Sequence, residues 1–251
     1  MEIAVCVKRV PLVGSTFMLT DDAMAIDTSR IGATLSPHEE NAVEAAVRLI
    51  EVHGGSITLF SVGSAQAEEQ LREQLAIGAD RAVLIETDGT EIDSQATAAV
   101  LAQAIDQDTT DFDLVLLGTE SADSGGFQTG IRIAHALGRP VVTNVKGLDL
   151  TDNKATCERA VGSTREVYEV QLPAVICVLD GLNIPRYPSV PGRIKARKKP
   201  VDRLSITIPE STTIRTSLRV PQSANKGAVD LGSGQDGAKA LVEVFKQIGV
   251  M

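Results

Sequence analysis

The sequence is poor in aromatic residues, which make up 3% of the chain, and it has no tryptophan. Alanine, valine, isoleucine and leucine must therefore fill the core, within a hydrophobic fraction of 43%. Small aliphatic side chains suit parallel strands, because helices bury such strands on both faces of the sheet. The 251 residues are enough for one large core or two modest ones.

Cysteine and histidine are also scarce, at three residues each. Cys6, Cys157 and Cys177 form no C-x-x-C pair, which argues against a disulfide framework and against a zinc site. The histidines share no metal-ligand spacing, so no metal site is predicted, and His53 and His135 are expected on helix surfaces.

The sequence lacks several segments and motifs that would mark a membrane protein, a targeted protein or a known class of enzyme. No stretch approaches the roughly 20 apolar residues of a membrane span, and the start, MEIAVCVKRV, resembles a strand more than a targeting peptide. We therefore expect a cytoplasmic protein without membrane insertion. Walker A, G-x-G-x-x-G and G-x-S-x-G motifs are absent, as are carboxylates paired for acid–base work. The sequence predicts no enzyme active site.

The charge is acidic overall but uneven. A net charge of −9 disfavours nucleic acid as a partner. Seven of the 24 Lys and Arg residues nevertheless lie in the 18 residues from Arg186 to Arg203, where Asp202 is the one acid. Composition alone leaves two interpretations open, a solvated loop or a recognition segment.

Strands and helices alternate through the first 145 residues. Ser36, Pro37 and Glu39 form a capping-box signature, and an amphipathic helix follows that ends at Gly54. Strands are expected at 3–7, 56–61, 82–85, 114–117 and 141–145, and further helices at 66–77, 94–104 and 127–137. This alternation predicts a doubly wound, mainly parallel, Rossmann-like α/β sheet.

The pattern changes after about residue 146. Short β-rich segments at 148–150, 155–160 and 167–172 are expected as added antiparallel strands, before a buried strand at 174–179. Residues 1–203 are predicted to form the α/β domain, and 204–251 an extended arm that ends in a helix at 238–248. Leu241, Val244 and Phe245 lie on one face of that helix, which a lone helix cannot bury, so a partner subunit is expected there.

A ligand is expected at the carboxyl ends of the strands, where helix N-termini offer free N–H groups. The richest candidate is the stretch 118–130, GTESADSGGFQTG. Glycines after Ser124 let the backbone approach a ligand closely, and Gln128 and Thr129 open the next helix. The plainer interpretation is a βα turn with Ser124 as a helix cap.

Residues 183–200, NIPRYPSVPGRIKARKKP, resemble the signature segment of electron-transfer flavoprotein beta subunits in their Pro-Arg-Tyr, the later proline and the basic tail. Supporting blocks stand in the expected order at 5–10 (VCVKRV), 37–49, 71–82, 113–118, 128–130 and 172–175. The resemblance therefore spans the chain and points to the beta, or small, subunit.

This resemblance implies a fold, cofactors and partners. The beta subunit is an α/β domain of the adenine-nucleotide-binding type that pairs with an alpha subunit holding the redox-active FAD. It buries AMP, or a second FAD in bifurcating relatives, and the order Gln-Thr-Gly at 128–130 favours AMP. Electrons arrive from flavin-dependent dehydrogenases and leave to a quinone reductase, so the resemblance implies an electron carrier without substrate turnover.

The resemblance also implies site residues. The nucleotide pocket falls on Cys6, Ser36, Val62, Ser121, Asp123, Ser124, Phe127, Gln128 and Thr129. Cys6 is expected to offer only its backbone, and Ser36, Val62 and Phe127 differ from the residues that many relatives carry. His38 is expected near the FAD of the alpha subunit.

Partner recognition is implied for the segment of about 183–200. Its apolar anchor is Val190, between Pro188 and Pro191, and Arg193 and Lys195 would attract acidic dehydrogenase surfaces. Ala160 stands where many relatives carry a glutamate, so the dehydrogenase served here is expected to differ.

Two other classes fit the strand–helix alternation. An ATP-using enzyme on a similar fold would explain the glycine-rich turn but not the basic Pro-Arg-Tyr segment or the long tail. A nucleotide-sensing module of the stress-protein type predicts homodimers, whereas the flavoprotein interpretation predicts a yellow heterodimer.

Overall fold

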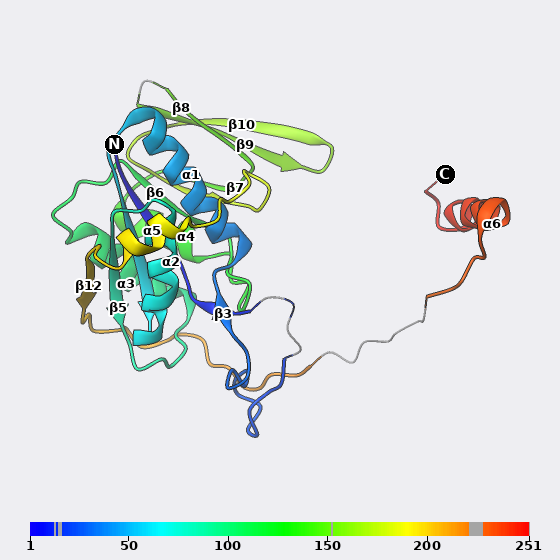
Figure 1. Cartoon of the computed structure of the whole chain (residues 1–251), viewed down its shortest axis with the longest axis horizontal. Helices are drawn as coiled ribbons and strands as arrows, with labels where there is room; N and C mark the ends of the chain where they lie inside the picture. The colour runs from blue at the N-terminus through cyan, green and yellow to red at the C-terminus, as the bar shows by residue number, and fades with distance from the viewer. Residues whose placement is uncertain (13, 15–16, 152, 221–227, 251) are drawn as a thin grey trace. The chain divides into compact units, whose positions relative to one another are not determined.

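The computed structural model describes residues 1–12, 14, 17–151, 153–220 and 228–250. It divides into two compact units, Met1–Leu218 and Arg219–Met251, which are described separately below. The first unit holds the sheet and the helices that cover it (Figure 1).

The first unit is built on a seven-stranded sheet in the order β12-β5-β4-β1-β6-β11-β7. Every neighbouring pair in it is parallel. Its strands are β1 (Glu2–Cys6), β4 (Ser56–Gly63), β5 (Arg81–Glu86), β6 (Leu114–Gly118), β7 (Val141–Val145), β11 (Ala174–Val178) and β12 (Val201–Leu204). The predicted doubly wound, mainly parallel α/β fold is confirmed.

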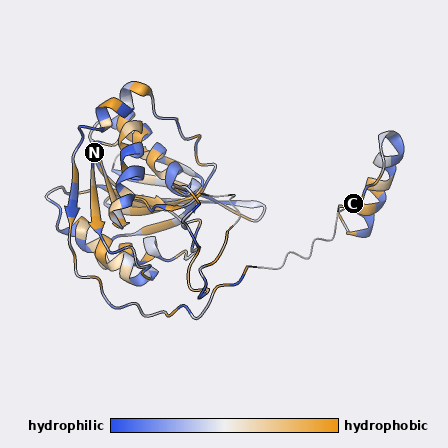
Figure 2. Ribbon diagram, turned by 60° about the horizontal axis from the view of Figure 1, so that its bottom comes forward, coloured by the Kyte–Doolittle hydropathy of each residue, from blue (hydrophilic) through white to orange (hydrophobic). Residues whose placement is uncertain are grey.

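Helices cover both faces of this sheet and create two cores. On one face lie α1 (Pro37–His53), α2 (Glu68–Ile77) and the short α5 (Val190–Ala196), and on the other α3 (Ser94–Asp106) and α4 (Thr129–Leu137). Side chains alternate along β1, so Ile3 and Val5 join the first core while Ala4 and Cys6 join the second. Apolar residues accordingly gather on the central strands (Figure 2).

The added antiparallel strands are also confirmed. They are β8 (Gly147–Thr151), β9 (Lys154–Val161) and β10 (Thr164–Gln171), paired in the order β10-β9-β8. Ala155 and Cys157 of β9 reach the first core. A two-residue pairing of β2 (Val10–Pro11) with β3 (Ala33–Thr34) was not predicted, because such short segments carry no periodicity.

The edge strand β12 was not predicted, and three helical elements of the first unit also differ from the prediction. The helix expected from residue 127 begins at Thr129, since Phe127 has a φ of +54° and cannot continue a right-handed helix. The helix expected from residue 66 is preceded by a 3₁₀ turn, η1 (Ala65–Ala67). The third is α5, inside the segment expected as a loop, where the Ser189 side chain accepts the N–H of Gly192 at 3.1 Å.

The predicted arm, residues 204–251, is divided between the two units. Residues up to Leu218 belong to the first unit, where Ile206 and Ile208 pack against the second core. The second unit holds α6 (Gly234–Gln247), which has no buried residue and carries its apolar residues on one side (Figure 2). Residues 221–227 of the predicted arm lie outside the described residues.

Within the described stretches, no helix combines the length and the apolar character that crossing a membrane would require.

Candidate functional site

A cavity of about 290 Å³ opens at the carboxyl ends of β1, β4 and β6. Strands added after β1 extend the sheet through β4 on one side and β6 on the other, so the cavity lies where the winding reverses. Ligands of open α/β sheets bind at this position. Its walls include Ser94 and Thr97 at the start of α3 and Thr129 at the start of α4. Both helix N-termini favour a negatively charged group.

The cavity combines apolar and hydroxyl side chains. Val62, Leu101 and Leu117 supply apolar surface, and Ser121 and Ser124 supply hydroxyls from the loop after β6. The Ser121 and Ser124 hydroxyls lie 2.8 Å apart. This composition is typical of a small-molecule site, where a few polar groups orient a ligand held by apolar contacts.

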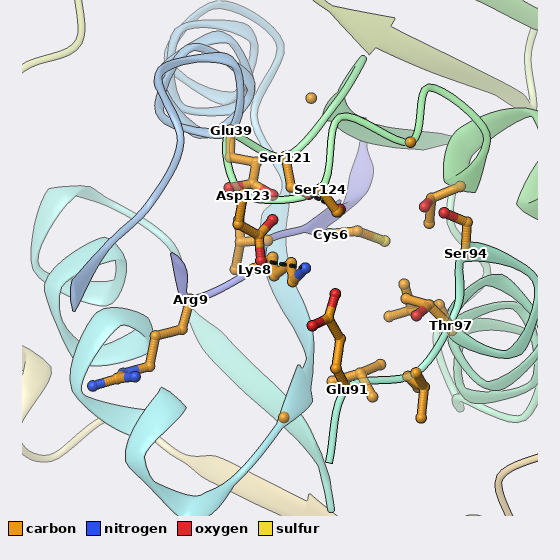
Figure 3. A pocket seen from close by; sticks show the side chains of 18 of the residues that line it. Cys6, Lys8, Arg9, Glu39, Glu91, Ser94, Thr97, Ser121, Asp123 and Ser124 are labelled. Carbon is orange, nitrogen blue, oxygen red and sulfur yellow. Dashed lines mark hydrogen bonds and ion pairs between the residues drawn. The ribbon is translucent and has the colours of Figure 1, made fainter. Parts of the chain in front are cut away.

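The Cys6 side chain faces the cavity from the end of β1 (Figure 3). Burial, followed by the nearby Cys177 and Glu39, raises the pKa of Cys6 to about 12. The thiol therefore stays protonated near neutral pH and is a poor nucleophile. Its chemistry fits a wall of the cavity and not a reactive centre.

An ion pair crosses the cavity between β1 and the loop after β6. Lys8 Nζ lies 2.6 Å from Asp123 Oδ2, and the two side chains face each other (Figure 3). Burial raises the pKa of Asp123, but the Lys8 ammonium together with hydrogen bonds from Ser121 and Ser124 outweighs this effect, and the pKa lies below its ordinary value. The Asp123 carboxyl group is therefore ionised, and the adjacent Lys8 ammonium largely cancels its charge.

Glu39 is a buried carboxyl group on the wall near α1. Its side chain accepts the N–H of Ser36 at 3.0 Å, and the predicted capping box is present. Burial raises the pKa of Glu39 to about 8, so this group is mainly protonated at neutral pH. The Ser36 hydroxyl also accepts the N–H of Ala122 at 3.0 Å, which joins the start of α1 to the loop after β6.

Gly126 lets that loop pass close to the start of α3. A Cβ atom at this position would lie 2.6 Å from the Ser94 hydroxyl. Phe127 then takes a left-handed conformation, with φ of +54°, before α4 begins. The glycine thus lets the loop and both helix N-termini converge on one cavity.

The chain matches a known family over most of its length. The sequence model of the family described as "Electron transfer flavoprotein domain" matches residues 23–209. Electron transfer flavoprotein subunit beta from Bacillus subtilis (strain 168) is 36% identical over 90% of this chain and 93% of that relative. The subunit beta from Thermoanaerobacterium thermosaccharolyticum is 33% identical over 97% of both chains. The chain belongs to the electron transfer flavoprotein beta-subunit family.

A third relative is a component of a larger complex. The caffeyl-CoA reductase-Etf complex subunit CarD from Acetobacterium woodii is 38% identical over 80% of this chain and 77% of that relative. Membership of the family establishes a role in electron transfer within a flavoprotein.

Seven of the nine residues predicted for the nucleotide pocket of this family member line the cavity. They are Cys6, Val62, Ser121, Asp123, Ser124, Phe127 and Thr129. Ser36 lies behind the wall, 1% exposed, and the Gln128 side chain accepts from the Arg132 guanidinium at 3.0 and 3.1 Å. Nucleotide contact for all nine stays a prediction.

Sequence reasoning assigned no individual role to several other lining residues. Lys8 and Glu39 were visible only as a strand end and a helix cap, and Glu91 and Thr97 carried no motif. The strand-end position of Lys8 was the one available signal, since a group there faces the ligand edge of a parallel sheet.

His38 lies outside this cavity. Its side chain is 13% exposed, and its Nε2 atom lies 3.5 Å from Asp180 Oδ1. Its buried Nδ1 atom has no hydrogen-bond partner among the described residues. A position near a flavin of another subunit stays a prediction for this residue.

The signature segment, residues 183–200, is anchored to α1. Arg186 Nε donates to Glu44 Oε2 at 2.8 Å, and Arg186 Nη1 donates to Glu51 Oε1 at 2.6 Å. Asn183 donates its backbone N–H to the Asn41 side chain at 3.1 Å and its side-chain amide to the Asn41 carbonyl at 2.9 Å. The backbone of this segment is thus fixed at its start.

Apolar side chains nevertheless remain exposed along the signature segment. Val190 is 73% exposed, and Ile184 and Tyr187 are more exposed still. Arg193 and Lys195 are exposed beside Val190. Large apolar groups held on a fixed backbone are typical of protein-binding surfaces.

Proposed function

We propose that this chain is the beta subunit of a heterodimeric electron transfer flavoprotein that holds AMP in the cavity at β1, β4 and β6. Its alpha subunit holds the FAD that carries the electrons. The observation that supports this most is the cavity itself, where the reversal of the sheet, two helix N-termini and seven predicted contacts coincide.

The charges around the cavity suit an anionic ligand, although four carboxyl groups line it. Lys8 neutralises Asp123, and burial keeps Glu39 mainly protonated at neutral pH. Arg215 lies 2.6 Å from Glu91 and offsets the charge of that carboxyl group. The fourth carboxyl group, that of Glu120, shares the lining of the cavity with the Arg9 guanidinium. The helix N-termini then supply the positive potential that a phosphate requires.

The residues present fit an adenosine phosphate. Thr129 and the backbone at the start of α4 would hold the phosphate, Val62 and Leu117 would contact the base, and Ser121 and Ser124 would bind hydroxyls. Bound AMP supplies binding free energy rather than chemistry. A ligand of the native state at a thousand times its dissociation constant stabilises the fold by about 4 kcal/mol.

The exposed apolar surfaces are assigned to protein partners. The one-sided apolar face of α6 would dock on the alpha subunit. Val190, between Pro188 and Pro191, would anchor a flavin-dependent dehydrogenase, with Arg193 and Lys195 as cationic neighbours. A quinone reductase would then accept the electrons.

His38 would lie beside the FAD of the alpha subunit. The half-buried imidazole with an unpartnered Nδ1 atom supports this assignment. A heterodimer carrying His38→Phe should show a shifted flavin midpoint potential, and an unchanged potential would remove His38 from this role.

The decisive experiment is co-expression with the cognate alpha subunit, followed by mass spectrometry of the nucleotides released on denaturation. We expect one AMP and one FAD per heterodimer. Release of two FAD molecules per heterodimer would mean that the cavity holds a second FAD in place of AMP, as in a bifurcating member. If the heterodimer releases one FAD and no other adenine nucleotide, the assignment of the cavity as a nucleotide site is wrong.

A second measurement distinguishes the proposed electron carrier from an ATP-using enzyme. The purified chain is incubated with ATP and magnesium, and released phosphate is recorded. The proposed carrier should show no turnover above the rate without protein, whereas turnover that scales with protein concentration would favour an ATP-using enzyme.

A further inference from the structure

One wall of the cavity is a loop without a sheet or helix of its own. Thr87, Gly89, Thr90, Glu91, Ile92 and Ser94 line the cavity between the end of β5 and the start of α3. The side-chain contacts within this loop are short-range: Asp88 accepts the N–H of Thr90 at 2.8 Å, and Thr87 accepts the N–H of Gly89 at 3.2 Å. Such local turns leave the position of the wall to contacts from elsewhere.

Those contacts come from residues 205–218, which we call the strap. The strap begins after β12, and Ile206 and Ile208 pack against the second core. At its far end, the N–H of Leu218 donates to the carbonyl of Ala23 at 2.8 Å. Both ends of the strap are therefore fixed on the first unit.

Asp93 joins the strap to the wall. Its Oδ2 atom accepts the N–H groups of Thr212 and Thr213 at 2.7 and 3.1 Å, and both threonine hydroxyls at 3.1 and 3.3 Å. Its own N–H donates to the Ser211 hydroxyl at 3.3 Å. Hydrogen bonds to a charged carboxylate are about twice as strong as neutral ones.

The same carboxylate also caps α3. Asp93 Oδ1 accepts the N–H of Ala96 at 2.8 Å. One oxygen thus fixes the helix whose N-terminus faces the cavity, and the other fixes the strap. The hydrogen bonds from Ala96, Thr212 and Thr213 lower the pKa of Asp93 far below its ordinary value. Its carboxyl group is therefore ionised near neutral pH.

A second contact fixes the wall next to Asp93. Arg215 Nη2 lies 2.6 Å from Glu91 Oε1, and Arg215 Nη1 donates to the carbonyl of Met24 at 3.0 Å. Glu91 reaches toward the cavity from this wall (Figure 3). The strap therefore sets the position of the wall at two adjacent points.

We propose that Asp93 is a positioning residue for the nucleotide: by holding the strap against the cavity wall, it slows the release of bound AMP. This inference rests on the proposed function of the cavity. Without the strap, the wall between β5 and α3 keeps its local turns and one hydrogen bond to β4, from the Thr87 N–H to the Gly63 carbonyl at 2.9 Å. Opening of the wall beyond Thr87 would provide a route for the ligand to leave.

The test exploits the two oxygens of Asp93. In Asp93→Asn the amide oxygen can still cap α3, because Asn and Asp are comparable caps. The amide nitrogen cannot accept the donors of Thr212 and Thr213. The variant therefore removes the contact of Thr212 and Thr213 with the wall, while the helix cap and the Arg215–Glu91 pair stay in place.

Release is measured on the purified heterodimer by adding an excess of isotope-labelled AMP and following its exchange into the protein by mass spectrometry. We expect Asp93→Asn to exchange about tenfold faster or more, because several hydrogen bonds to a charged group are lost. The double variant Thr212→Val, Thr213→Val should also exchange faster, and Thr212→Ser, Thr213→Ser should restore the original rate.

Asp88→Asn is the matched control, since Asp88 lies in the same loop and bonds only within it among the described residues. It should exchange at the wild-type rate. Asp93→Asn exchanging at the wild-type rate would overturn the role of Asp93 and leave the nucleotide site intact. Failure of the serine variants to restore the rate would also overturn it. A wild-type heterodimer that carries no AMP would remove the proposed function and this inference together.

Discussion

Two carboxyl groups five residues apart on α1 serve two different regions. Glu39 lines the cavity at the start of the helix, and Glu44 lies beneath the signature segment. Both are buried, at 5% and 2% exposure. Burial raises the pKa of Glu39 to about 8, whereas Arg186 and Arg48 overcome the effect of burial on Glu44 and hold its pKa below the ordinary value.

The difference suits what each region is proposed to bind. A neutral Glu39 adds no negative charge to a cavity proposed to hold a phosphate. An ionised Glu44 fixes the Arg186 guanidinium, so the signature segment keeps its backbone in place while Val190 stays exposed. Helix α1 therefore supports the proposed ligand site with a neutral carboxyl group and the proposed docking surface with an ionised one.

The largest expected effect is that of Glu39→Gln as the pH rises from 5 to 8. The native state keeps the Glu39 proton up to a pKa of about 8, while the unfolded chain loses it near 4.5. The stability of the wild type therefore falls as the pH rises between these values. Glutamine can still accept the Ser36 N–H and carries no charge. The variant should gain on the order of 3 kcal/mol over the wild type between pH 5 and pH 8.

This gain is read from thermal melts of both heterodimers at a fixed AMP concentration. The difference in Tm should grow by roughly 6–12 °C from pH 5 to pH 8. Glu69→Gln, an exposed position on α2, is the control and should show a constant difference. A constant difference for Glu39→Gln as well would mean that Glu39 is ionised in the native state and that the contrast with Glu44 is wrong.

A smaller effect is expected on the other side of the comparison. Glu44→Gln leaves the Arg186 and Arg48 guanidinium groups without a buried counter-charge and should cost about 2 kcal/mol. Solvent reaches Arg186, so the cost stays below that of a fully buried pair. Glu51→Gln removes the exposed partner of the same arginine and should cost about 0.5 kcal/mol or less.

The two variants are compared at pH 7 by thermal melts of the heterodimer. Glu44→Gln should lower the Tm by roughly 4–8 °C, and Glu51→Gln by about 2 °C at most. Equal losses would show that burial does not distinguish the two contacts. The contrast between α1 at the cavity and α1 beneath the signature segment would then rest on Glu39 alone.

The sequence predicted the alternating strands and helices because their periodicity is local. It also predicted the start of α1, since Ser36, Pro37 and Glu39 stand at adjacent positions. It did not predict α5, a seven-residue helix too short to show a repeat. Among the residues predicted for the nucleotide pocket, Ser124, Gln128 and Thr129 were also indicated by the glycine-rich strand end. The others came from the resemblance to a family.

Contacts between segments that are far apart in the chain could not be predicted from the sequence. The Lys8–Asp123 pair joins residues more than a hundred positions apart, and Asp93 and Thr212 are similarly separated. The pKa of Glu39 depends on burial, which the order of residues around a helix start does not reveal. Such features need the packing of the whole unit.

The smallest expected effect concerns Val190, and it tests whether the exposed surface of the signature segment docks a partner. Val190→Ala removes two methyl groups from a side chain that is 73% exposed, so the fold should lose little. If Val190 fills a pocket on a dehydrogenase, the loss should be about 1 kcal/mol of binding, a roughly fivefold lower kcat/KM for reduction of the heterodimer.

Val52 on α1 provides the matched control, because it is 77% exposed and lies outside the signature segment. Val52→Ala should leave kcat/KM unchanged, and both variants should keep the AMP content and flavin potential of the wild type. If the two variants lower kcat/KM equally, the effect is one of general surface hydrophobicity. If neither does, the anchored backbone beneath Val190 serves the fold, and α1 supports one binding region instead of two.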